Sequence, residues 1–393
     1  MAIQAAFTLT ANYPFASLAN MIISQEVFAD QLGKHQTLVD KARVDGTLYG
    51  DRKLYYATDV LKSHAWGKDS EAANLLAIHR PKDPKVQAIV LDTYRQIDLT
   101  LDDYLSKQAW SDEGSFSQFA SRMLGWLRET KKVHEGTLYN VFIGTDETSV
   151  GAQMQTVDIT TAVGSTTGDE KNRLEVFAIA NKLADLLVEM GDYNRDFNDY
   201  GNLHSYDEGN IKVIWNSKYL NKIRKVDTPT IFNRDGLVDK LGGEVLPARY
   251  FGTVITSANV ANFTATTPSA GKPIKSADST YVPGTNHANG CLRAVIEKEV
   301  TVGSVTKNCF PGDEIPAGAT VKAGGDFELG EVYIEEDDVI CKIVTKLPPI
   351  MSAFEVGTSF FNPKSLTNNH YLTWGYNSLQ HLKDYPFITV KAI

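Results

Sequence analysis

Two strand-like runs decide the fold, Thr47-Leu-Tyr-Gly-Asp-Arg-Lys-Leu-Tyr-Tyr-Ala-Thr58 and Val86-Gln-Ala-Ile-Val-Leu-Asp-Thr-Tyr-Arg-Gln-Ile-Asp-Leu-Thr-Leu101. In the second run Ile97, Leu99 and Leu101 alternate with polar residues, which is the period of a half-buried β-strand. Glycine and proline interrupt the residues between the runs, so we expect a loop there. A two-stranded ribbon is at best marginally stable in water. Because little sequence nearby could cover its apolar face, we expect another molecule to cover this hairpin.

The bulk composition is typical of a soluble globular protein. The chain has 393 residues, of which 42% are hydrophobic and 22% charged. This length predicts two or three domains around a sizeable core. The apolar runs are too short for a transmembrane helix, so no membrane partner is expected. The first residues lack a basic segment before an apolar core, so no secretory signal is expected.

The charge balance argues against nucleic-acid recognition. The net charge is -9, from 48 acidic and 39 basic residues. Nucleic-acid binding is mostly the neutralisation of phosphates by Lys and Arg, so direct recognition is disfavoured, whereas enclosing DNA without gripping it is compatible. The three cysteines, Cys291, Cys309 and Cys341, are odd in number and far apart. This pattern predicts buried free thiols in a reducing compartment.

Apolar residues at helical spacing predict three helices. The first covers residues 15–32. The second follows a capping box at Ser115 and carries an apolar stripe to residue 142, with a kink at Gly136. The third covers residues 169–191 and begins with two acidic residues, which suit a helix N-terminus. Its predicted buried face consists of Val176, Phe177, Ala180, Leu183, Ala184, Leu187 and Val188.

The remaining sequence is mostly strand and turn. A strand with a turn is predicted over residues 145–167, and a polar loop over residues 192–209. A short helix is predicted over residues 217–224. Further strands are predicted over residues 211–215, 250–255, 339–344, 350–358, 371–376 and 386–391. Residues 257–330 are rich in Thr, Ser, Ala, Gly, Pro and Val and have no helical period, which predicts a small all-β insertion.

One loop has an incomplete calcium-binding pattern. Asp192, Asn194 and Asp196 have the spacing of the first ligands of a calcium loop. Phe197 occupies the position that requires glycine, and Leu203 occupies the position of the bidentate glutamate. We therefore expect a solvated acidic turn.

The other candidate motifs are also incomplete. His134 and Glu135 would begin a zinc-protease helix, but Leu138 stands where the second histidine belongs, so we expect ordinary helix-surface residues. The glycine-rich turn at residues 164–169 lacks the lysine of a phosphate-binding loop. No serine has the surroundings of a nucleophile elbow. The sequence therefore predicts no enzyme activity, no cofactor and no metal.

Three segments resemble the major capsid proteins of tailed phages. Residues 110–142, with Gly114-Ser-Phe116 at the helix start, resemble the spine helix of that family. Residues 195–215, from Arg195-Asp-Phe-Asn198 to Ile211-Lys-Val-Ile-Trp215, resemble part of the axial domain. Residues 362–374, from Asn362-Pro-Lys-Ser-Leu366 to His370-Tyr-Leu-Thr-Trp374, resemble the strand that returns to the peripheral domain. The local sequence is most similar to short-tailed phages of the phi-twenty-nine kind.

The resemblance implies an α+β fold of the HK-ninety-seven type with six parts in seven segments of the chain. These are an N-terminal arm (1–43), an extended hairpin loop or E-loop (44–110), the spine helix with the peripheral domain (111–163), the axial domain (164–256 and 331–362), the β-rich insertion (257–330) and the peripheral return strand (363–393). The hairpin would lie on a neighbouring subunit, which would supply backbone hydrogen bonds and cover its apolar face. The implied interface residues are Tyr49, Arg52, Tyr55, Ile97, Leu99 and Leu101.

The implied function is a structural head protein that assembles into pentamers and hexamers of an icosahedral shell around double-stranded DNA. Its partners would be further copies of itself, a portal, and scaffolding or decoration proteins, with no sequence-specific contact to the packaged DNA. The location would be the virion, after assembly in the cytoplasm of a bacterial host.

Three other classes of protein stay open. A cellular compartment shell of the encapsulin kind shares the fold but encloses an enzyme, whereas the β insertion and the phi-twenty-nine-like segments favour a virus. Residues 257–330 would also fit a β-rich adhesin or carbohydrate-binding surface protein. The two long helices and the lack of a signal peptide count against that class. A hydrolase is the third, but it would need a nucleophile, a base and an oxyanion site.

Overall fold

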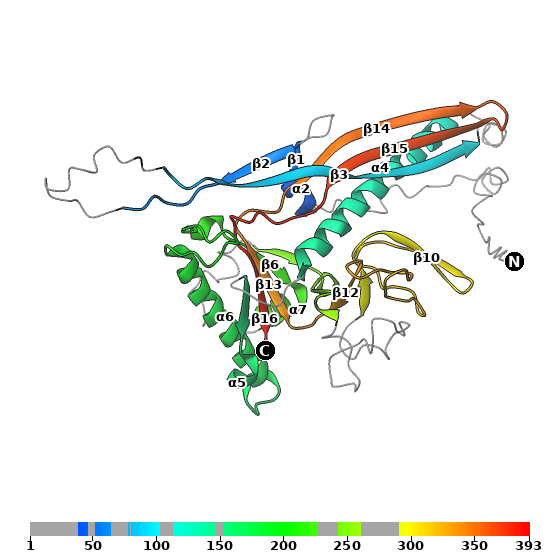
Figure 1. Ribbon diagram of the computed structural model, residues 1–393. Coiled ribbons are helices and arrows are strands. Elements are labelled where there is room, and N and C mark those ends of the chain that lie inside the picture. The colour runs from blue at the N-terminus through cyan, green and yellow to red at the C-terminus, as the bar shows by residue number, and fades with distance from the viewer. Residues whose placement is uncertain are drawn as a thin grey trace. The chain divides into compact units, whose positions relative to one another are not determined.

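The computed structural model describes residues 38–45, 52–63, 78, 80–102, 113–146, 153–225, 243–260 and 291–393. The chain divides into two compact units. The first consists of Met1–Asp51, Val90–Glu135 and Ile350–Ser378, and the second of Arg52–Ile89, Gly136–Pro349 and Leu379–Ile393. Figure 1 shows strand β3 (Lys85–Asp102) and helix α4 (Glu113–Gly144). Each of these elements has residues in both units. The helix predicted over residues 15–32 lies outside the described residues.

The first unit is built on a sheet with the strand order β1-β14-β15-β3, which ends with β2 (Arg52–Ala57) of the second unit. Helix α2 (Leu38–Ala42) leads into β1 (Arg43–Asp45), which runs parallel to β14 (Ile350–Asn362). Strand β15 (Thr367–Asn377) is antiparallel to β14 and to β3.

The long pairing between β15 and β3 corrects one sequence prediction. The ladder runs from Thr367 opposite Asp102 to Asn377 opposite Leu91. The predicted strand over residues 86–101 is confirmed by β3. The prediction that this run forms a lone two-stranded ribbon was wrong, because β15 already pairs with most of its length. Residues that lie so far apart in sequence leave no local signal of their pairing.

One face of this sheet is apolar and buried. Leu101 of β3 and Leu372, Trp374 and Tyr376 of β15 are buried, and these positions share a face because side chains alternate along a strand. The ring of His134 on α4 contacts Trp374 and Tyr376, with centroids 6.0 and 5.9 Å apart. The predicted long helix is confirmed, and α4 continues through Gly136 without a break.

The core of the second unit is a sheet covered by helices. Its strand order is β5 (Met154–Val157), β16 (Phe387–Ala392), β13 (Val339–Val344), β6 (Lys212–Asn216) and β7 (Glu244–Leu246). Helices α6 (Asp169–Gly191) and α7 (Ser217–Lys225) pack their apolar sides into the same core as these strands. The strands predicted at 211–215, 339–344 and 386–391 and the helices predicted at 169–191 and 217–224 are confirmed.

The central strand β13 contains a fully buried lysine. All six residues of β13 are buried, including Lys342. Its ammonium group donates a hydrogen bond to the Thr145 carbonyl at 3.1 Å and lies 4.3 Å from the centroid of the Phe387 ring. One backbone carbonyl and one aromatic face therefore replace the water around this charge.

A second sheet of this unit has the order β4 (Thr145–Asp146), β8 (Gly252–Val254), β12 (Val332–Glu335) and β9 (Leu292–Ala294). The hairpin of β10 (Lys298–Val302) and β11 (Val305–Cys309) comes between β9 and β12 in the sequence. Short 3-10 helices cover Glu208–Asn210 and Ala248–Tyr250. Residues 291–330 of the predicted insertion contain strands and turns, whereas Val260 is helical. The core of this region also includes Ile255, Val332 and Ile334 from outside residues 257–330. Residues 261–290 of the insertion are outside the described residues.

Two details of the secondary structure differ from the prediction. Residues 145–167 contain the helix α5 (Ile159–Val163), which begins where the Asp158 carboxylate accepts a hydrogen bond from the Thr161 amide. In α6, Ala184 and Val188 are exposed, whereas Ile179, Leu186 and Met190 are buried. The prediction followed one stripe of apolar residues, but the buried face of α6 is turned about its axis toward Ile179 and Leu186.

Candidate assembly surface

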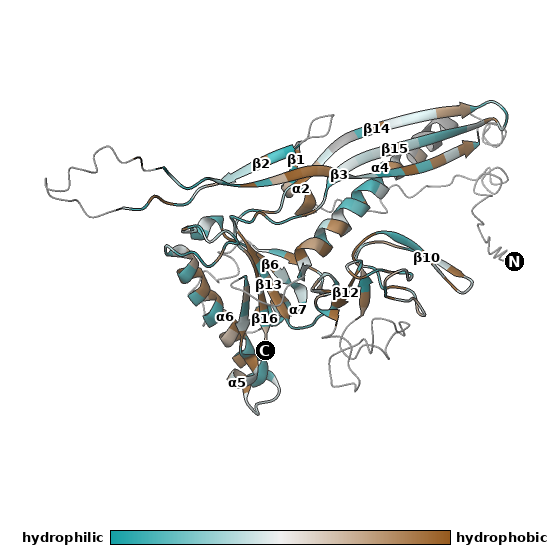
Figure 2. Cartoon of the chain, in the orientation of Figure 1, coloured by the Kyte–Doolittle hydropathy of each residue, from teal (hydrophilic) through white to brown (hydrophobic). Residues whose placement is uncertain are grey.

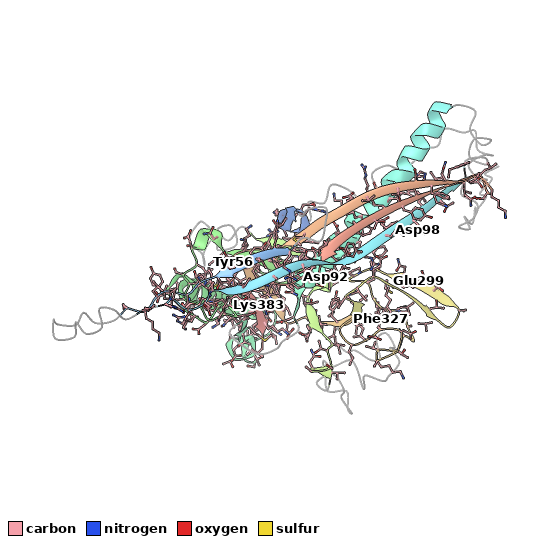
Figure 3. All side chains as sticks on the ribbon, turned by 45° about the horizontal axis from the view of Figure 1, so that its top comes forward. Tyr56, Asp92, Asp98, Glu299, Phe327 and Lys383 are labelled. Carbon is pink, nitrogen blue, oxygen red and sulfur yellow. The ribbon has the colours of Figure 1, made fainter. Side chains whose placement is uncertain are left out.

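We call residues 52–89 the arm, which is distinct from the predicted N-terminal arm (1–43). It begins with β2, whose residues alternate between exposed and covered positions. On β2, Arg52, Leu54 and Tyr56 are exposed, whereas Ala57 is buried. Tyr56 is 65% exposed, and it lies on the arm in Figure 3. A tyrosine left in water at this level indicates that the described residues of the chain do not cover this side of β2.

The predicted interface residues of the first run lie on different faces. Arg52 is exposed, but Tyr55 is three positions further along and faces the opposite way. Tyr55 is half-buried, and the Lys346 ammonium lies 5.8 Å from its ring centroid. Burial raises the pKa of Tyr55. Tyr49 lies outside the described residues.

The largest exposed apolar side chains of the arm were not predicted. We call residues 60–84 the distal loop, of which residues 60–63, 78 and 80–84 are described. Among these, Leu61 and Ile78 are 77% and 79% exposed. Aliphatic side chains that are exposed together on one segment are typical of a contact surface. The exposed apolar residues described in the arm are Leu54, Tyr56, Val60, Leu61, Ile78 and Val86.

The predicted interface residues of the second run lie in the sheet of the first unit. Ile97 pairs with Leu372 and Leu99 with His370, while Leu101 is buried. Ile97 and Leu99 are half-buried. Their role in a subunit contact stays a prediction, but their backbone groups already have partners in β15.

A second exposed apolar group lies at the turn between β14 and β15. Phe360 and Phe361 are both exposed although neighbouring strand residues point to opposite faces. Leu366 in the turn has a positive φ of 54° and a partly exposed side chain. The corresponding end of β14 is brown, and so apolar, in Figure 2. The sequence signal was the Phe360-Phe361 pair beside a turn, which the strand prediction did not use.

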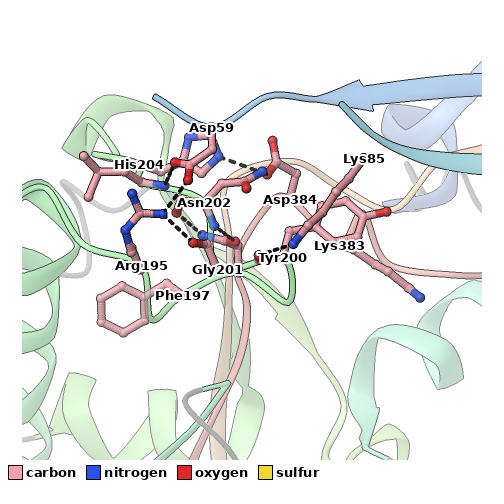
Figure 4. Close-up of polar contacts among 12 residues, drawn as sticks. Asp59, Lys85, Arg195, Phe197, Tyr200, Gly201, Asn202, His204, Lys383 and Asp384 are labelled. Carbon is pink, nitrogen blue, oxygen red and sulfur yellow. Dashed lines mark hydrogen bonds and ion pairs between the residues drawn. The ribbon is translucent and has the colours of Figure 1, made fainter. Parts of the chain in front are cut away.

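A polar network holds the base of the distal loop (Figure 4). The Asp59 carboxylate accepts hydrogen bonds from Arg195 Nη1 at 2.8 Å, from the Val60 amide at 2.9 Å and from the Leu203 amide at 3.2 Å. Arg195 Nη1 also donates to the Gly201 carbonyl at 2.8 Å. The hydrogen bond from Arg195, followed by that from Leu203, lowers the pKa of Asp59 well below its ordinary value.

The other leg of the distal loop is tied to the same region. Lys85 donates a hydrogen bond to the Tyr200 carbonyl, and its ammonium lies 5.0 Å from the centroid of the Tyr200 ring. The Gln87 amide nitrogen donates to the His381 carbonyl at 2.9 Å, and its oxygen accepts from the Lys383 amide at 2.9 Å. Both legs therefore end on residues 195–203 and 381–383.

The loop that receives these contacts is itself held by side chains. Asn198 and Asn202 are buried and exchange hydrogen bonds of 2.8 and 2.9 Å. The Asn202 side-chain amide donates to Asp384 at 2.7 Å, and His204 Nε2 lies 3.0 Å from the same carboxylate oxygen. The predicted polar loop over residues 192–209 is thus a well-connected structure. Its sequence signal was the run of Asn and Asp, which form side-chain bonds to nearby backbone.

The polar residues at the middle of α4 are buried, which corrects the prediction of ordinary helix-surface residues. His134 is 1% and Glu135 0% exposed. Arg43 of β1 donates a hydrogen bond to Glu135 at 2.6 Å, and His134 Nε2 lies 3.3 Å from the Tyr376 hydroxyl. A buried carboxylate needs such a charged partner. The absence of an apolar pattern at these positions hid their burial.

The described residues contain no cluster of His, Cys, Asp or Glu that could hold a metal ion. All three cysteines are free thiols, with Cys309 and Cys341 buried and Cys291 half-buried. Desolvation raises the pKa of the Cys341 thiol well above its ordinary value. Within the described ranges, no helix has the length and hydrophobicity needed to span a membrane.

Comparisons with known proteins give a fold. No protein-family model matches the chain, and no curated protein matches its sequence. The capsid structure of Staphylococcus phage Andhra is similar, with a TM-score of 0.51 and 10% identity over 95% of this chain and 87% of that one. A structure of the head fiber and inner core protein gp22 of native bacteriophage P68 matches with a TM-score of 0.49 and 11% identity, over 95% and 91% of the two chains. The capsid structure of the cyanophage P-SCSP1u matches with a TM-score of 0.41 and 11% identity, over 95% and 93%.

The first of these similarities extends over nearly the whole chain. At this TM-score the chain has the fold of the Andhra capsid chain.

Proposed function

We propose that this chain is the major capsid protein of a tailed phage and assembles with further copies of itself into the shell of the head. The single observation that carries the proposal is the match to the Andhra capsid fold over 95% of the chain. The exposed apolar side chains of the arm and of the β14–β15 turn support it, because such surfaces are costly in a monomer.

The finer description follows the sequence resemblance. Residues 44–110, which include the arm, would be the E-loop of an HK-ninety-seven-type fold, and α4 would be its spine helix. The phage would belong to the phi-twenty-nine-like group. Pentamers and hexamers are rings in which one patch of a subunit meets a different patch of the next. An arm that reaches a neighbour fits such a contact. Because each copy makes several contacts, individually weak interfaces suffice in a closed shell.

The same proposal covers contents and location. The shell would enclose double-stranded DNA in the virion without sequence-specific contacts, which the net charge of -9 supports. Assembly would take place in the host cytoplasm, with a portal and scaffolding or decoration proteins as partners. Double-stranded DNA in particles from the natural source would support this function. An enclosed enzyme would favour a cellular compartment instead.

The test removes apolar side chains from the distal loop. The double variant Leu61→Ser with Ile78→Ser should fold like the wild type but give few or no particles. Both side chains are exposed, so their loss costs little in the monomer and much in a contact. Light scattering and negative-stain microscopy of purified full-length protein measure the result.

The matched control replaces two exposed apolar residues away from the arm and from the loop that holds it. Val188 of α6 and Val305 of β11 are 75% and 63% exposed, and Val188→Ser with Val305→Ser should leave particles intact. Wild-type protein that stays monomeric at high concentration would refute the shell function. Normal particles from the loop variant would refute the role of the loop alone.

A further inference from the structure

The distal loop has a fixed starting direction, because both of its legs are held at its base. We propose that Asp59, Lys85, Gln87 and Arg195 form a clamp that aims the distal loop at the next subunit, with Arg195 as its central positioning residue. This inference rests on the proposed shell function and names how the arm is oriented for it.

The position of the clamp is the first argument. Asp59 follows β2 by two residues, and Lys85 is the first residue of β3. The two side chains therefore mark the place where the loop leaves its strands. The described residues 58–63, 78 and 80–84 belong to no strand. The side-chain contacts at the base therefore hold the chain at the points where β2 and β3 end.

The shared anchor is the second argument. Asp59 is held by Arg195 and the Leu203 amide, while Lys85 is held by Tyr200 of the same loop. Gln87 is 7% exposed, and its amide bonds in both directions to the backbone at residues 381 and 383. Because both legs are bound to residues 195–203 and 381–383, these residues fix the direction in which the described ends of the loop leave β2 and β3.

The prepared geometry of the support is the third argument. Gly201 has a φ of +64°, which is unfavourable for other residue types, and its carbonyl accepts from the same Arg195 nitrogen that reaches Asp59. The buried Asn198–Asn202 pair fixes the turn that carries this carbonyl. Arg195 is thus oriented before the loop is added, which lowers the entropic cost of holding Asp59.

The function of the clamp follows from what the loop carries. Val60 comes directly after Asp59, and Leu61 and Ile78 are the most exposed apolar side chains described in the arm. If the base turned, Val60 and Leu61 would change direction with Asp59, because they follow it directly in the chain. A fixed base confines them to one region, which raises the rate of productive contact with a neighbour.

The test uses full-length Arg195→Gln, Asp59→Ala and their combination. Each should assemble several-fold more slowly than the wild type or give particles of broader diameter, while the melting temperature of the subunit stays unchanged. The double variant should be no worse than the worse single variant, since the two residues act through one contact. Arg195→Lys, which keeps a donor, should restore part of the assembly rate.

A second measurement distinguishes a change in the direction of the distal loop from a general loss of subunit association. Hydrogen exchange in the unassembled subunit should speed up at Val60 and Leu203 in Asp59→Ala, because both amides lose their acceptor. Adding Arg195→Gln to the Leu61→Ser and Ile78→Ser background should cause no further assembly defect, because there is nothing left to aim. The control is Arg173→Gln, an exposed pair with Glu170 on α6, which should change neither readout.

The possible outcomes distinguish this inference from the proposed function. Wild-type protein that forms no particles contradicts the shell function. Wild-type particles together with normal assembly of Arg195→Gln and Asp59→Ala contradict the clamp and leave the shell function standing. A further loss when Arg195→Gln is added to the loop variant also contradicts the clamp, because it would show that Arg195 acts elsewhere.

Discussion

Strand β13 and the distal loop both belong to the second unit but differ strongly in side-chain burial. Every residue of β13 is buried, including a lysine, whereas Leu61 and Ile78 of the distal loop are exposed. Both segments contain aliphatic side chains, so hydrophobicity alone does not separate them. The difference teaches that burial within the chain depends on neighbours from distant sequence, and that the loop has its apolar residues without such neighbours among the described residues.

The largest expected effect comes from the core around β13. Leu183 of α6 is 1% exposed and belongs to the same apolar core as Ile343. Leu183→Ala should lower the free energy of unfolding by about 3 kcal/mol, because it removes buried methyl groups and leaves a cavity. Urea unfolding followed by circular dichroism measures it. Val188→Ala on the exposed side of α6 is the control, and an equal loss there would break the comparison.

Replacing Lys342 should raise the free energy of unfolding, whereas replacing Leu183 should lower it. Burial lowers the pKa of this lysine from 10.5 to about 8, although the nearby Asp146 charge acts in the other direction. The folded protein therefore holds the proton less tightly than the unfolded chain, which destabilises the fold by about 3 kcal/mol below pH 8. This penalty falls as the pH rises from about 8 toward 10.5.

Lys342→Met should therefore raise the free energy of unfolding at pH 7 by about 1 kcal/mol, since the loss of the hydrogen bond to Thr145 offsets part of the gain. Unfolding curves between pH 7 and 10.5 check this. The wild type should gain stability relative to the variant over that range. A constant difference between the two would show that Lys342 does not titrate there.

The effect of loop substitutions on stability should be small. Ile78→Ser is expected to change the free energy of unfolding by less than about 0.5 kcal/mol, because the side chain is already in water. The same urea experiment measures it beside Leu183→Ala. A loss of several kcal/mol would mean that the loop packs on its own chain, which would remove the contrast with β13.

Labelling of the cysteine thiols tests how accessible each side chain is and needs no substitution. Burial raises the pKa of the Cys341 thiol on β13 and of Cys309, so neither should react with a thiol reagent in the folded subunit. Cys291 is half-buried and should be modified first, though slowly because its pKa is also raised by desolvation. Mass spectrometry of the labelled protein gives the order. Rapid labelling of Cys341 would show that β13 opens.

Periodicity in the sequence predicted the elements but not their partners. Helices α4 and α6 were found because each repeats its own apolar period, and strands β13 and β16 because each is a short run of strand-forming residues. The pairing of β3 with β15 could not be found this way, since the alternation of Ile97, Leu99 and Leu101 is the same whether the covering strand is local or distant. A strand of a lone ribbon and an inner strand of a sheet can have the same alternation of apolar and polar residues.

The place of the subunit contact stays a prediction. The hairpin from Thr47 to Leu101 was expected to lie on a neighbouring subunit. Leu61 and Ile78 were not named as contact residues because a loop has no apolar period, although both side chains are exposed. The clamp was also hidden, because the pairing of Asp59 with Arg195 joins residues that no sequence pattern connects. Likewise, the buried charge of Glu135 depends on Arg43 from another element.

Leu366 gives the turn between β14 and β15 a practical importance. Its φ of 54° lies in the left-handed region, where a residue with a side chain costs about 1–2 kcal/mol. Replacement by glycine would relax the backbone and remove a partly exposed leucine at once, whereas asparagine would relax it and keep a side chain of similar length. This turn is therefore a suitable first position for stabilising the subunit by substitution or for inserting a foreign peptide for display.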